Sequence, residues 1–343
     1  MARRLSDKVL ISVLLSDNAS VDKFENEKAE FLRPTNSKMK TCTQIRGGSP
    51  GLKWAVILST LSGVAVGCVA APPGPSTLTP LREALTLYAS FDGTADASFA
   101  RGDPKIYWAP SMQHPRLGTP GLPKGDVVTL APGQGRFGSA LRFHKKVPQM
   151  VFFQADKNVA YRTNEWRGTV SFWLRLNPDE DLEPGYCDPV QITPREWNDA
   201  AFFVDFTKDD KPRHFRLGAF ADRQIWDPTK RDWEKVPSHE RPMVTVTEPP
   251  FGRDRWTHVV FTFSNFNTGR KDGESRLYLN GQLQGTLTGR EQTFTWDPAK
   301  SLVMIGLSYV GLFDDLAIFN RALTDEDIQI LFHLQSGAGA LVP

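Results

Sequence analysis

The chain has 343 residues, of which 40% are hydrophobic and 23% are charged, so it can bury the core of one large domain or two ordinary ones. Its formal net charge is only +2, and the basic excess lies in residues 1–67, which leaves a nearly neutral body. A nearly neutral body argues against a nucleic-acid partner, because such a partner requires a basic face.

The three cysteines, Cys42, Cys68 and Cys187, have a spacing that suits neither a zinc site nor a disulfide framework. Two of them fall in or before a predicted export signal. The body therefore keeps Cys187 alone, and we expect its stability to come from core burial.

Residues 1–71 contain a predicted export signal rather than part of a fold. Residues 1–38 are polar and mixed in charge, so we expect no fixed structure there, or a true start of translation at Met39. A basic stretch follows Met39, and residues 54–67 form an apolar run with the length of a signal h-region. We interpret residues 39–71 as this signal.

Two kinds of cleavage fit the signal. Residues 65–68 resemble a bacterial lipobox, in which Cys68 would be lipidated, although Ala65 stands where Leu is usual. The alternatives are plain secretion, with cleavage near Ala70 or Ala71, and an uncleaved anchor. These readings predict an exported protein, either a lipoprotein of the bacterial cell envelope or a secreted one, that meets a membrane only through its signal or lipid anchor.

A proline-rich stretch, residues 72–84, then predicts a stiff linker. Beyond it, alternating apolar runs predict short strands, and residues 99–132, 177–199 and 221–250 are expected to be long loops. The predicted strands cover residues 85–93, 139–143, 150–153, 169–176, 201–206, 214–220, 255–263, 275–279, 282–288, 302–306 and 314–319.

The turn and helix signals are local. Asn280-Gly281 predicts a two-residue hairpin, because both turn positions favour positive φ. Thr324 can cap a C-terminal helix with Asp327 three positions on. Many short strands and one short helix predict an all-β fold of two stacked antiparallel sheets, over residues 85–336, with a tail at 337–343.

Several segments, in their order and spacing, resemble the LamG-like domain of the concanavalin A-like lectin/glucanase superfamily. The resemblance implies a two-sheet jelly-roll sandwich in which the first and last strands lie side by side. These segments are residues 88–93, 135–143, 168–174, 256–259, 277–281, 305–306 and 313–323.

The resemblance also implies a metal site, since members of this superfamily often hold a structural calcium ion beside the terminal strands. Asp314 is the expected ligand, with Asp92 second, and Asp315 is expected to face solvent. Calcium prefers several oxygen ligands. The alternative is that Asp314 binds backbone N–H groups at a strand end.

Aromatic residues in the predicted loops are candidates for ligand contact. A flat ring can cover the C–H face of a sugar while nearby amides or acids bind its hydroxyls. The candidates are Trp226, Trp233, Tyr186 and Trp197. The alternative is that these rings pack inward and pin the loops.

Catalytic residues are not found. Retaining glycosidases of the superfamily carry Glu-x-Asp-x-x-Glu on one strand, whereas the nearest acidic run here, residues 179–183, ends in Pro-Gly. Residues 133–138 formally match a dinucleotide fingerprint but lack its strand and helix context, so we interpret them as a turn. His258, inside an apolar strand, is expected to be structural.

We therefore expect an exported, non-catalytic surface module that binds a carbohydrate or a partner protein of the envelope or the extracellular space, and that calcium could stabilise. One alternative is a glycoside hydrolase or lyase with an unfamiliar site, which requires two facing carboxylates. The other is a structural envelope protein without a ligand.

Overall fold

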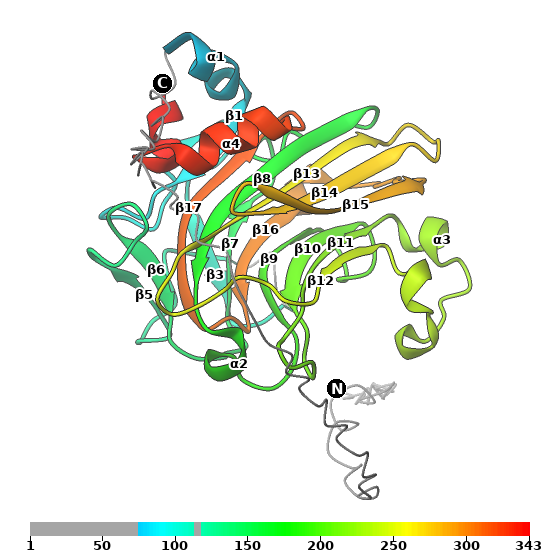
Figure 1. Cartoon of the computed structure of the whole chain (residues 1–343), viewed down its shortest axis with the longest axis horizontal. Helices are drawn as coiled ribbons and strands as arrows, with labels where there is room; N and C mark the ends of the chain where they lie inside the picture. The colour runs from blue at the N-terminus through cyan, green and yellow to red at the C-terminus, as the bar shows by residue number, and fades with distance from the viewer. Residues whose placement is uncertain (1–74, 113–117) are drawn as a thin grey trace, which may run out of the picture. The chain divides into compact units, whose positions relative to one another are not determined.

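The computed structural model describes residues 75–112 and 118–343. Within this part the chain forms two antiparallel β-sheets that face each other as layers (Figure 1). The predicted all-β, two-sheet sandwich is therefore confirmed. The predicted export signal and the lipidation site, Cys68, lie outside the described residues.

Sheet A runs in the order β15-β14-β13-β8-β17-β1-β2, with β6 also paired to β17 and β5 paired to β6. Its strands are β1 (Leu85–Ala89), β2 (Phe99–Ala100), β5 (Val128–Ala131), β6 (Ala140–Phe143), β8 (Trp166–Arg175), β13 (Thr257–Phe266), β14 (Gly273–Leu279), β15 (Gln282–Arg290) and β17 (Gly311–Phe319).

Sheet B runs in the order β12-β11-β10-β9-β16-β7-β3-β4. Its strands are β3 (Ile106–Ala109), β4 (Thr119–Pro120), β7 (Met150–Gln154), β9 (Cys187–Thr193), β10 (Ala201–Phe206), β11 (Phe215–Phe220), β12 (Met243–Val246) and β16 (Leu302–Leu307).

The first and last strands are neighbours, as the resemblance implied. Strand β1 pairs antiparallel with β17, and Leu85 lies opposite Phe319. The predicted hairpin is also confirmed, because Asn280 and Gly281 have φ values of 51° and 77° between the paired strands β14 and β15.

The core lies between the two sheets and is rich in aromatic rings. Alternation along β8 turns Phe172 inward, where it stacks on Phe313 of β17 with ring centroids 5.2 Å apart. Trp166 is fully buried and contacts Phe202 of sheet B, with centroids 5.5 Å apart. Rings of this size bury much apolar area, which explains how a body with one cysteine is held together.

Helices cover part of the outer face of sheet A, and two of them lie where the sequence predicted a linker and a tail. Residues 75–84, predicted as a linker, form helix α1 (Pro75–Ala84), whose Leu81 is fully buried. The predicted tail packs as the 3₁₀ helix η4 (Gly337–Leu341), whose Leu341 is fully buried too. Between them, α4 (Asp325–His333) begins with the predicted capping box of Thr324 and Asp327.

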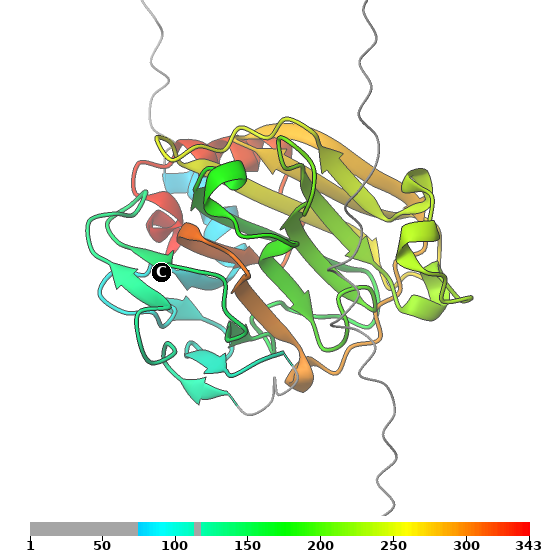
Figure 2. The same cartoon turned by 90° about the horizontal axis from the view of Figure 1, so that it is seen from below.

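The remaining helices are one-turn elements in the connections between strands. They are α2 (Pro178–Asp181), α3 (Arg223–Trp226), η1 (Trp233–Lys235), η2 (Ser238–Glu240) and η3 (Pro298–Lys300). The segment from α3 to η2 lies at one side of the domain and the β5–β6 hairpin at the other (Figures 1 and 2).

The predicted long loops contain strands that sequence patterns did not show. Strands β2 to β5, β9 and β12 all fall inside them. Strand β9 is central in sheet B, yet it contains Pro189, which lies beside a register shift between β9 and β10. A proline is tolerated in a central strand at such an irregularity. In the sequence alone, however, the proline argues against a strand here, so β9 was not predicted.

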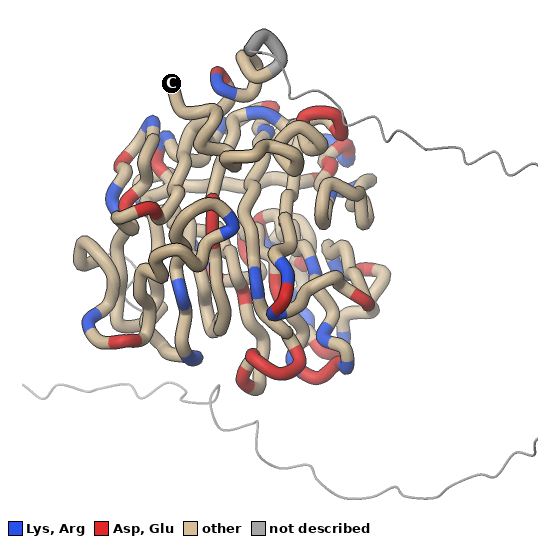
Figure 3. Tube along the Cα trace, turned by 60° about the vertical axis from the view of Figure 1, so that its left-hand side comes forward, with Lys and Arg blue, Asp and Glu red and all other residues tan. Residues whose placement is uncertain are grey.

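Charges of both signs are interspersed over the domain rather than separated (Figure 3). None of the helices in the described part of the chain has the length and apolar character needed to cross a membrane.

Candidate functional site

The outer face of sheet B carries the best candidate for a binding site. Along β10, Phe202 and Val204 point into the core, so Phe203 and Asp205 point outward. On β11, Arg216 lies opposite Asp205, and Gly218 lies opposite Phe203. We call this surface, with Phe220 and the neighbouring Gln191, the sheet-B face.

A glycine shapes this surface. The Phe203 ring covers Gly218, where a Cβ atom would lie 2.5 Å from Phe203 Cζ. The ring can therefore lie flat and stack on Phe220, with centroids 5.4 Å apart. A larger residue at position 218 would lift the ring and break up this aromatic floor.

Three of the four predicted rings gather above Phe220. Its ring centroid lies 5.6 Å from Trp197, 5.0 Å from Trp226 and 5.8 Å from Trp233. Trp197 and Trp233 also meet edge to face at 5.1 Å. We call these three tryptophans and Phe220 the ring cluster; the tryptophans are half-buried, so they pack and still reach the surface.

Specific contacts fix the ring cluster in place. Trp226 Nε1 donates a hydrogen bond to the carbonyl of Asn198 at 2.9 Å. The guanidinium of Arg241 lies 4.3 Å from the centre of the Trp233 ring, and Asp232 caps η1 by accepting from the N–H of Glu234. The rings are thus held before a ligand arrives, which reduces the ordering cost of binding.

A polar cavity lies beside the ring cluster. It has a volume of about 290 Å³, and Asn198, Asp222, Gln224 and Lys230 are among its lining residues. Asn198 supplies an amide and Asp222 an acid next to the rings. Rings next to amide and charged groups are the combination expected for a sugar.

Tyr186, the fourth predicted ring, does not join the ring cluster. It is 37% exposed and lies over Arg216, whose guanidinium carbon is 5.2 Å from the ring centre. Since Arg216 points outward from β11, Tyr186 belongs to the same sheet-B face but to a different part of it.

The floor between Tyr186 and the ring cluster is polar and buried. Arg216 forms a forked ion pair with Asp205, and its Nε donates to Oδ1 at 2.9 Å. Burial raises the pKa of Asp205, and the Arg216 guanidinium opposes that rise. Burial also raises the pKa of Asp188, and the charge of Asp205 adds to the effect.

Gln191, on the same face, has a buried side-chain amide whose hydrogen-bonding capacity is not fully used. Its side chain is 1% exposed, and its Nε2 has no hydrogen-bond partner among the described residues. It lies on β9 opposite Phe203 of the aromatic floor. A buried amide donor without a partner costs free energy, and a ligand hydroxyl or carbonyl would supply the missing acceptor.

The expected metal ligands hold a loop. Asp314 Oδ2 accepts from the backbone N–H groups of Arg136 and Phe137 at 2.7 and 3.0 Å, and Oδ1 accepts from the N–H of Asp315 at 2.7 Å. Asp92 accepts from the N–H of Ser139 at 2.6 Å. Asp314 therefore binds the Gly-rich turn at residues 133–138, and Asp92 binds the residue that follows it. This matches the alternative for Asp314, in which its carboxylate binds backbone N–H groups.

The expectation for Asp315 is wrong. Its side chain is buried, where it accepts from the hydroxyl of Tyr88 at 2.8 Å and from the N–H of Ala338 at 3.0 Å. Strand β17 has a register irregularity between Asp314 and Ala317, and Asp315 has a φ of 55°, so strand alternation does not hold here.

These acids do not fit a calcium site as they stand. Three N–H groups already occupy the Asp314 oxygens, and burial raises the pKa of Asp314 to about 8. No cluster of three or more His, Cys, Asp or Glu side chains suited to a metal occurs in residues 75–112 and 118–343. Calcium binding stays a prediction.

His258 is structural, as expected. It is 1% exposed, exchanges a hydrogen bond with Ser171 Oγ at 2.8 Å through Nε2, and stacks on Trp173 with centroids 4.7 Å apart. The Gly-rich segment at 133–138 is a turn, in which the N–H of Gly135 donates to the carbonyl of Gly138.

Sequence reasoning missed the Asp205–Arg216 pair and Gln191. One signal was present, because Asp205 interrupts the apolar run of residues 201–206 and a charge in such a run requires a partner. Nothing in the sequence indicated that Arg216 was that partner, since the pairing depends on the register of β10 and β11.

A family model described as the concanavalin A-like lectin/glucanases superfamily matches residues 153–329. No curated protein matches the chain. Among solved structures, domain 4 of an extracellular arabinanase from Geobacillus stearothermophilus, in complex with arabinotriose, is 18% identical with a TM-score of 0.45. That alignment covers 72% of this chain and 97% of the other.

The binding domain of botulinum neurotoxin DC has been solved in complex with SialylT and with rat synaptotagmin II. The two structures are 14% and 15% identical to this chain, with TM-scores of 0.49 and 0.48. Each alignment covers 76% of this chain and 52% of the neurotoxin chain, so this chain spans about half of that length.

Proposed function

This chain belongs to the concanavalin A-like lectin/glucanase superfamily, and on that premise we propose that it is an exported, non-catalytic module that binds carbohydrate at the sheet-B face. The observation that supports the proposal most directly is the convergence of Trp197, Trp226 and Trp233 on Phe220, on the same face as the unpaired amide of Gln191.

The two halves of the site have different chemical roles. The exposed edges of the ring cluster would cover the apolar C–H face of a sugar ring, which favours a pyranose or furanose unit over a flexible chain. Gln191 and the Asp205–Arg216 pair would bind hydroxyl groups, and planar polar groups of this kind fix the orientation of a saccharide.

Binding rather than cleavage is favoured by the state of the two acids on this face. Asp188 has a raised pKa, as a general acid requires, but Asp205 is held by Arg216 through both carboxylate oxygens. A carboxylate in a forked ion pair is a weak base and nucleophile. Release of reducing ends from a glycan that binds would instead favour the hydrolase or lyase alternative.

A glycan array followed by titration calorimetry tests the proposal. Against the tightest glycan, Trp233→Ala and Gln191→Leu should each weaken binding about tenfold or more, because each removes one desolvated contact of about 1–3 kcal/mol. Trp108→Ala is the matched control, since Trp108 of β3 is also half-buried but packs against the core between the sheets.

An array without binding, combined with capture of a specific protein that Trp233→Ala abolishes, would assign the face to a partner protein. No ligand of either class would favour a structural envelope role. Export and lipidation of Cys68 are proposed from the sequence pattern alone, and the mass of the mature N-terminal peptide tests both.

A further inference from the structure

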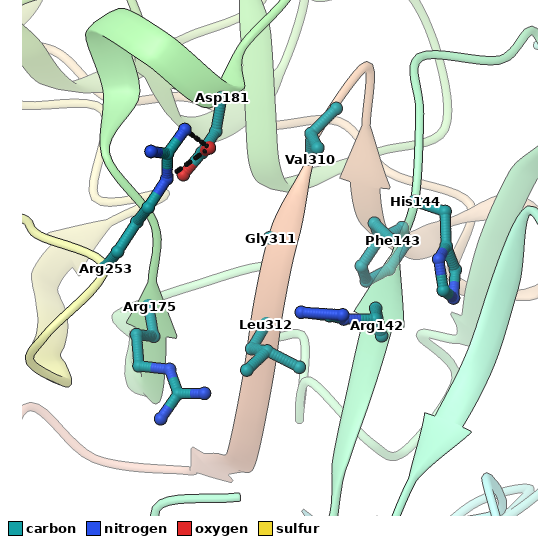
Figure 4. Close-up of a pocket in the computed structure, with 9 residues that line it drawn as sticks. All are labelled: Arg142, Phe143, His144, Arg175, Asp181, Arg253, Val310, Gly311 and Leu312. Atoms are coloured by element: carbon teal, nitrogen blue, oxygen red, sulfur yellow. Dashed lines mark hydrogen bonds and ion pairs between the residues drawn. The ribbon is translucent and has the colours of Figure 1, made fainter. Parts of the chain in front are cut away.

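A second pocket, on the outer side of sheet A, is lined by arginine side chains. It has a volume of about 300 Å³, and its lining includes Arg142 of β6, Arg175 of β8, Arg253, and Gly311 and Leu312 of β17. Figure 4 shows the guanidinium groups of Arg142 and Arg175 approaching Leu312 from its two sides.

Strand register brings the two arginines to one face. Leu312 is paired with Arg142 on one neighbouring strand and with Arg175 on the other. Residues paired across antiparallel strands point to the same side of a sheet, so the three side chains form one row. With a strand spacing of about 4.8 Å, the two arginine backbones are about 10 Å apart.

The third arginine of the pocket is neutralised. Arg253 Nε donates to Asp181 Oδ1 at 2.7 Å, and its Nη1 donates to Glu180 at 2.8 Å, as Figure 4 shows for Asp181. Asp181 is the single acid among the lining residues of the pocket, and it is occupied by this contact.

Arg142 and Arg175 have no such partner. Neither makes a salt bridge or a side-chain hydrogen bond among the described residues, and the guanidinium of Arg175 lies 5.3 Å from the centre of the Trp256 ring. Two unpaired like charges on one face of a sheet repel each other. An anion between them would remove this repulsion.

We propose that this arginine pocket binds an oxyanion, the carboxylate or sulfate group of an acidic saccharide. Guanidinium groups present planar, forked donors that match carboxylate and sulfate oxygens, and two of them facing one space can bind a single anionic group from both sides. The site is on the opposite sheet from the proposed sheet-B face and does not depend on it.

The neighbouring surface supports a saccharide as the carrier of the anion. An adjoining pocket, of about 400 Å³, is lined by Trp173, Trp256, Phe332 and Asn280 and by two further arginines, Arg136 and Arg255. Arg175 connects the two pockets, because it lines the arginine pocket and covers the Trp256 ring of the other. Rings and an amide beside an anion site fit the body of an acidic sugar.

Calorimetry and thermal melting with the full chain test the proposal. The probes are oligogalacturonate, a neutral galactose oligomer, inorganic sulfate, and sodium chloride at matched ionic strength. Oligogalacturonate should bind and raise the Tm of the wild type, and the neutral oligomer and chloride should not. Arg142→Met and Arg175→Met should each weaken binding at least tenfold.

Arg167→Met is the matched control, because Arg167 is an exposed arginine of the same strand, β8, and does not line the pocket. In the absence of ligand and at low salt, Arg142→Met should also raise the Tm, since it removes the repulsion. That second readout does not depend on the ligand and shows that the variant folds.

The outcomes separate the possible sources of the anion. Sulfate and oligogalacturonate effects that both disappear in Arg142→Met support the oxyanion site, and a stronger effect of the oligomer identifies the saccharide as its carrier. Equal shifts with chloride, or shifts that Arg142→Met retains, overturn the proposal. Trp233→Ala should leave the binding of oligogalacturonate and sulfate unchanged, so this experiment does not depend on whether the sheet-B face binds carbohydrate.

Discussion

At the scale of single residues, His258 shows how burial sets a charge state. It is enclosed by Trp173, Phe332 and Ser171, and burial lowers its pKa from 6.5 to about 3. Because the folded-state pKa lies below the unfolded one, the neutral ring stabilises the fold above pH 6.5. This contribution is lost as the pH falls from 6.5 toward 3.

His258→Gln should therefore change the pH dependence of stability. The difference in unfolding free energy between wild type and variant should shrink as the pH falls from about 7 to about 4.5, by up to about 1.4 kcal/mol per pH unit. Urea unfolding at the two pH values measures it. A difference that is the same at both would show that His258 does not titrate in this way.

Asp314 is the residue that ties the Gly-rich turn to the last strand. Asp314→Ala should lower the unfolding free energy by about 2–4 kcal/mol, because three backbone N–H groups lose their acceptor. Asp92→Ala, at an exposed acid with one such bond, should cost less than about 1.5 kcal/mol.

The same preparations test calcium. If N–H groups alone satisfy Asp314, then EDTA should leave the Tm of the wild type unchanged. A fall in Tm with EDTA that calcium restores, and that Asp314→Ala abolishes, would return Asp314 to the role of a calcium ligand.

At the scale of elements, helix α1 decides where the domain begins. Its Leu81 is fully buried against the cluster that also contains Leu341 of η4, and Arg82 donates to the carbonyl of Ala340 at 3.1 Å. Leu81→Ala should cost about 2–4 kcal/mol of stability. Leu283→Ala, at a leucine that is 47% exposed, is the control and should cost about 0.5 kcal/mol or less.

Urea unfolding measures both leucine variants. Equal and small effects would mean that residues 75–84 behave as the linker that the prolines suggested. The proline pattern was misleading here because Pro75 stands at the start of α1, where a missing N–H costs nothing, although Pro80 lies inside the helix.

Strands were predictable where apolar side chains alternate along the chain, even in β8, which is buried on both faces. The alternation of Val170, Phe172 and Leu174 and the Asn280-Gly281 turn have local causes, so the sequence alone indicates them. Strand β9 was missed because Pro189 and a register shift break its pattern. Asp315 was misplaced because a register irregularity in β17 changes which way the acid points.

At the scale of the whole domain, the sandwich and the pairing of β1 with β17 could be predicted from local patterns and the family resemblance. Which face of which sheet carries the candidate binding site could not. The ring cluster joins residues of the connection before β10, strand β11 and the segment after it, and their meeting depends on tertiary packing. The two arginines of the pocket on sheet A likewise meet through strand pairing, because Leu312 is paired with Arg142 on one side and with Arg175 on the other. Their positions in the sequence do not indicate this.

The claim that carbohydrate binds at the sheet-B face has one direct test, the side-chain amide resonance of Gln191 in NMR spectra recorded during titration with the tightest glycan. Because Nε2 of Gln191 has no partner among the described residues, its signals should shift as the glycan supplies one. The amide signals of Asn158, which is buried and already donates to the carbonyls of Asp103 and Gln154, should stay in place. An unchanged Gln191 signal at saturating glycan would contradict the claim.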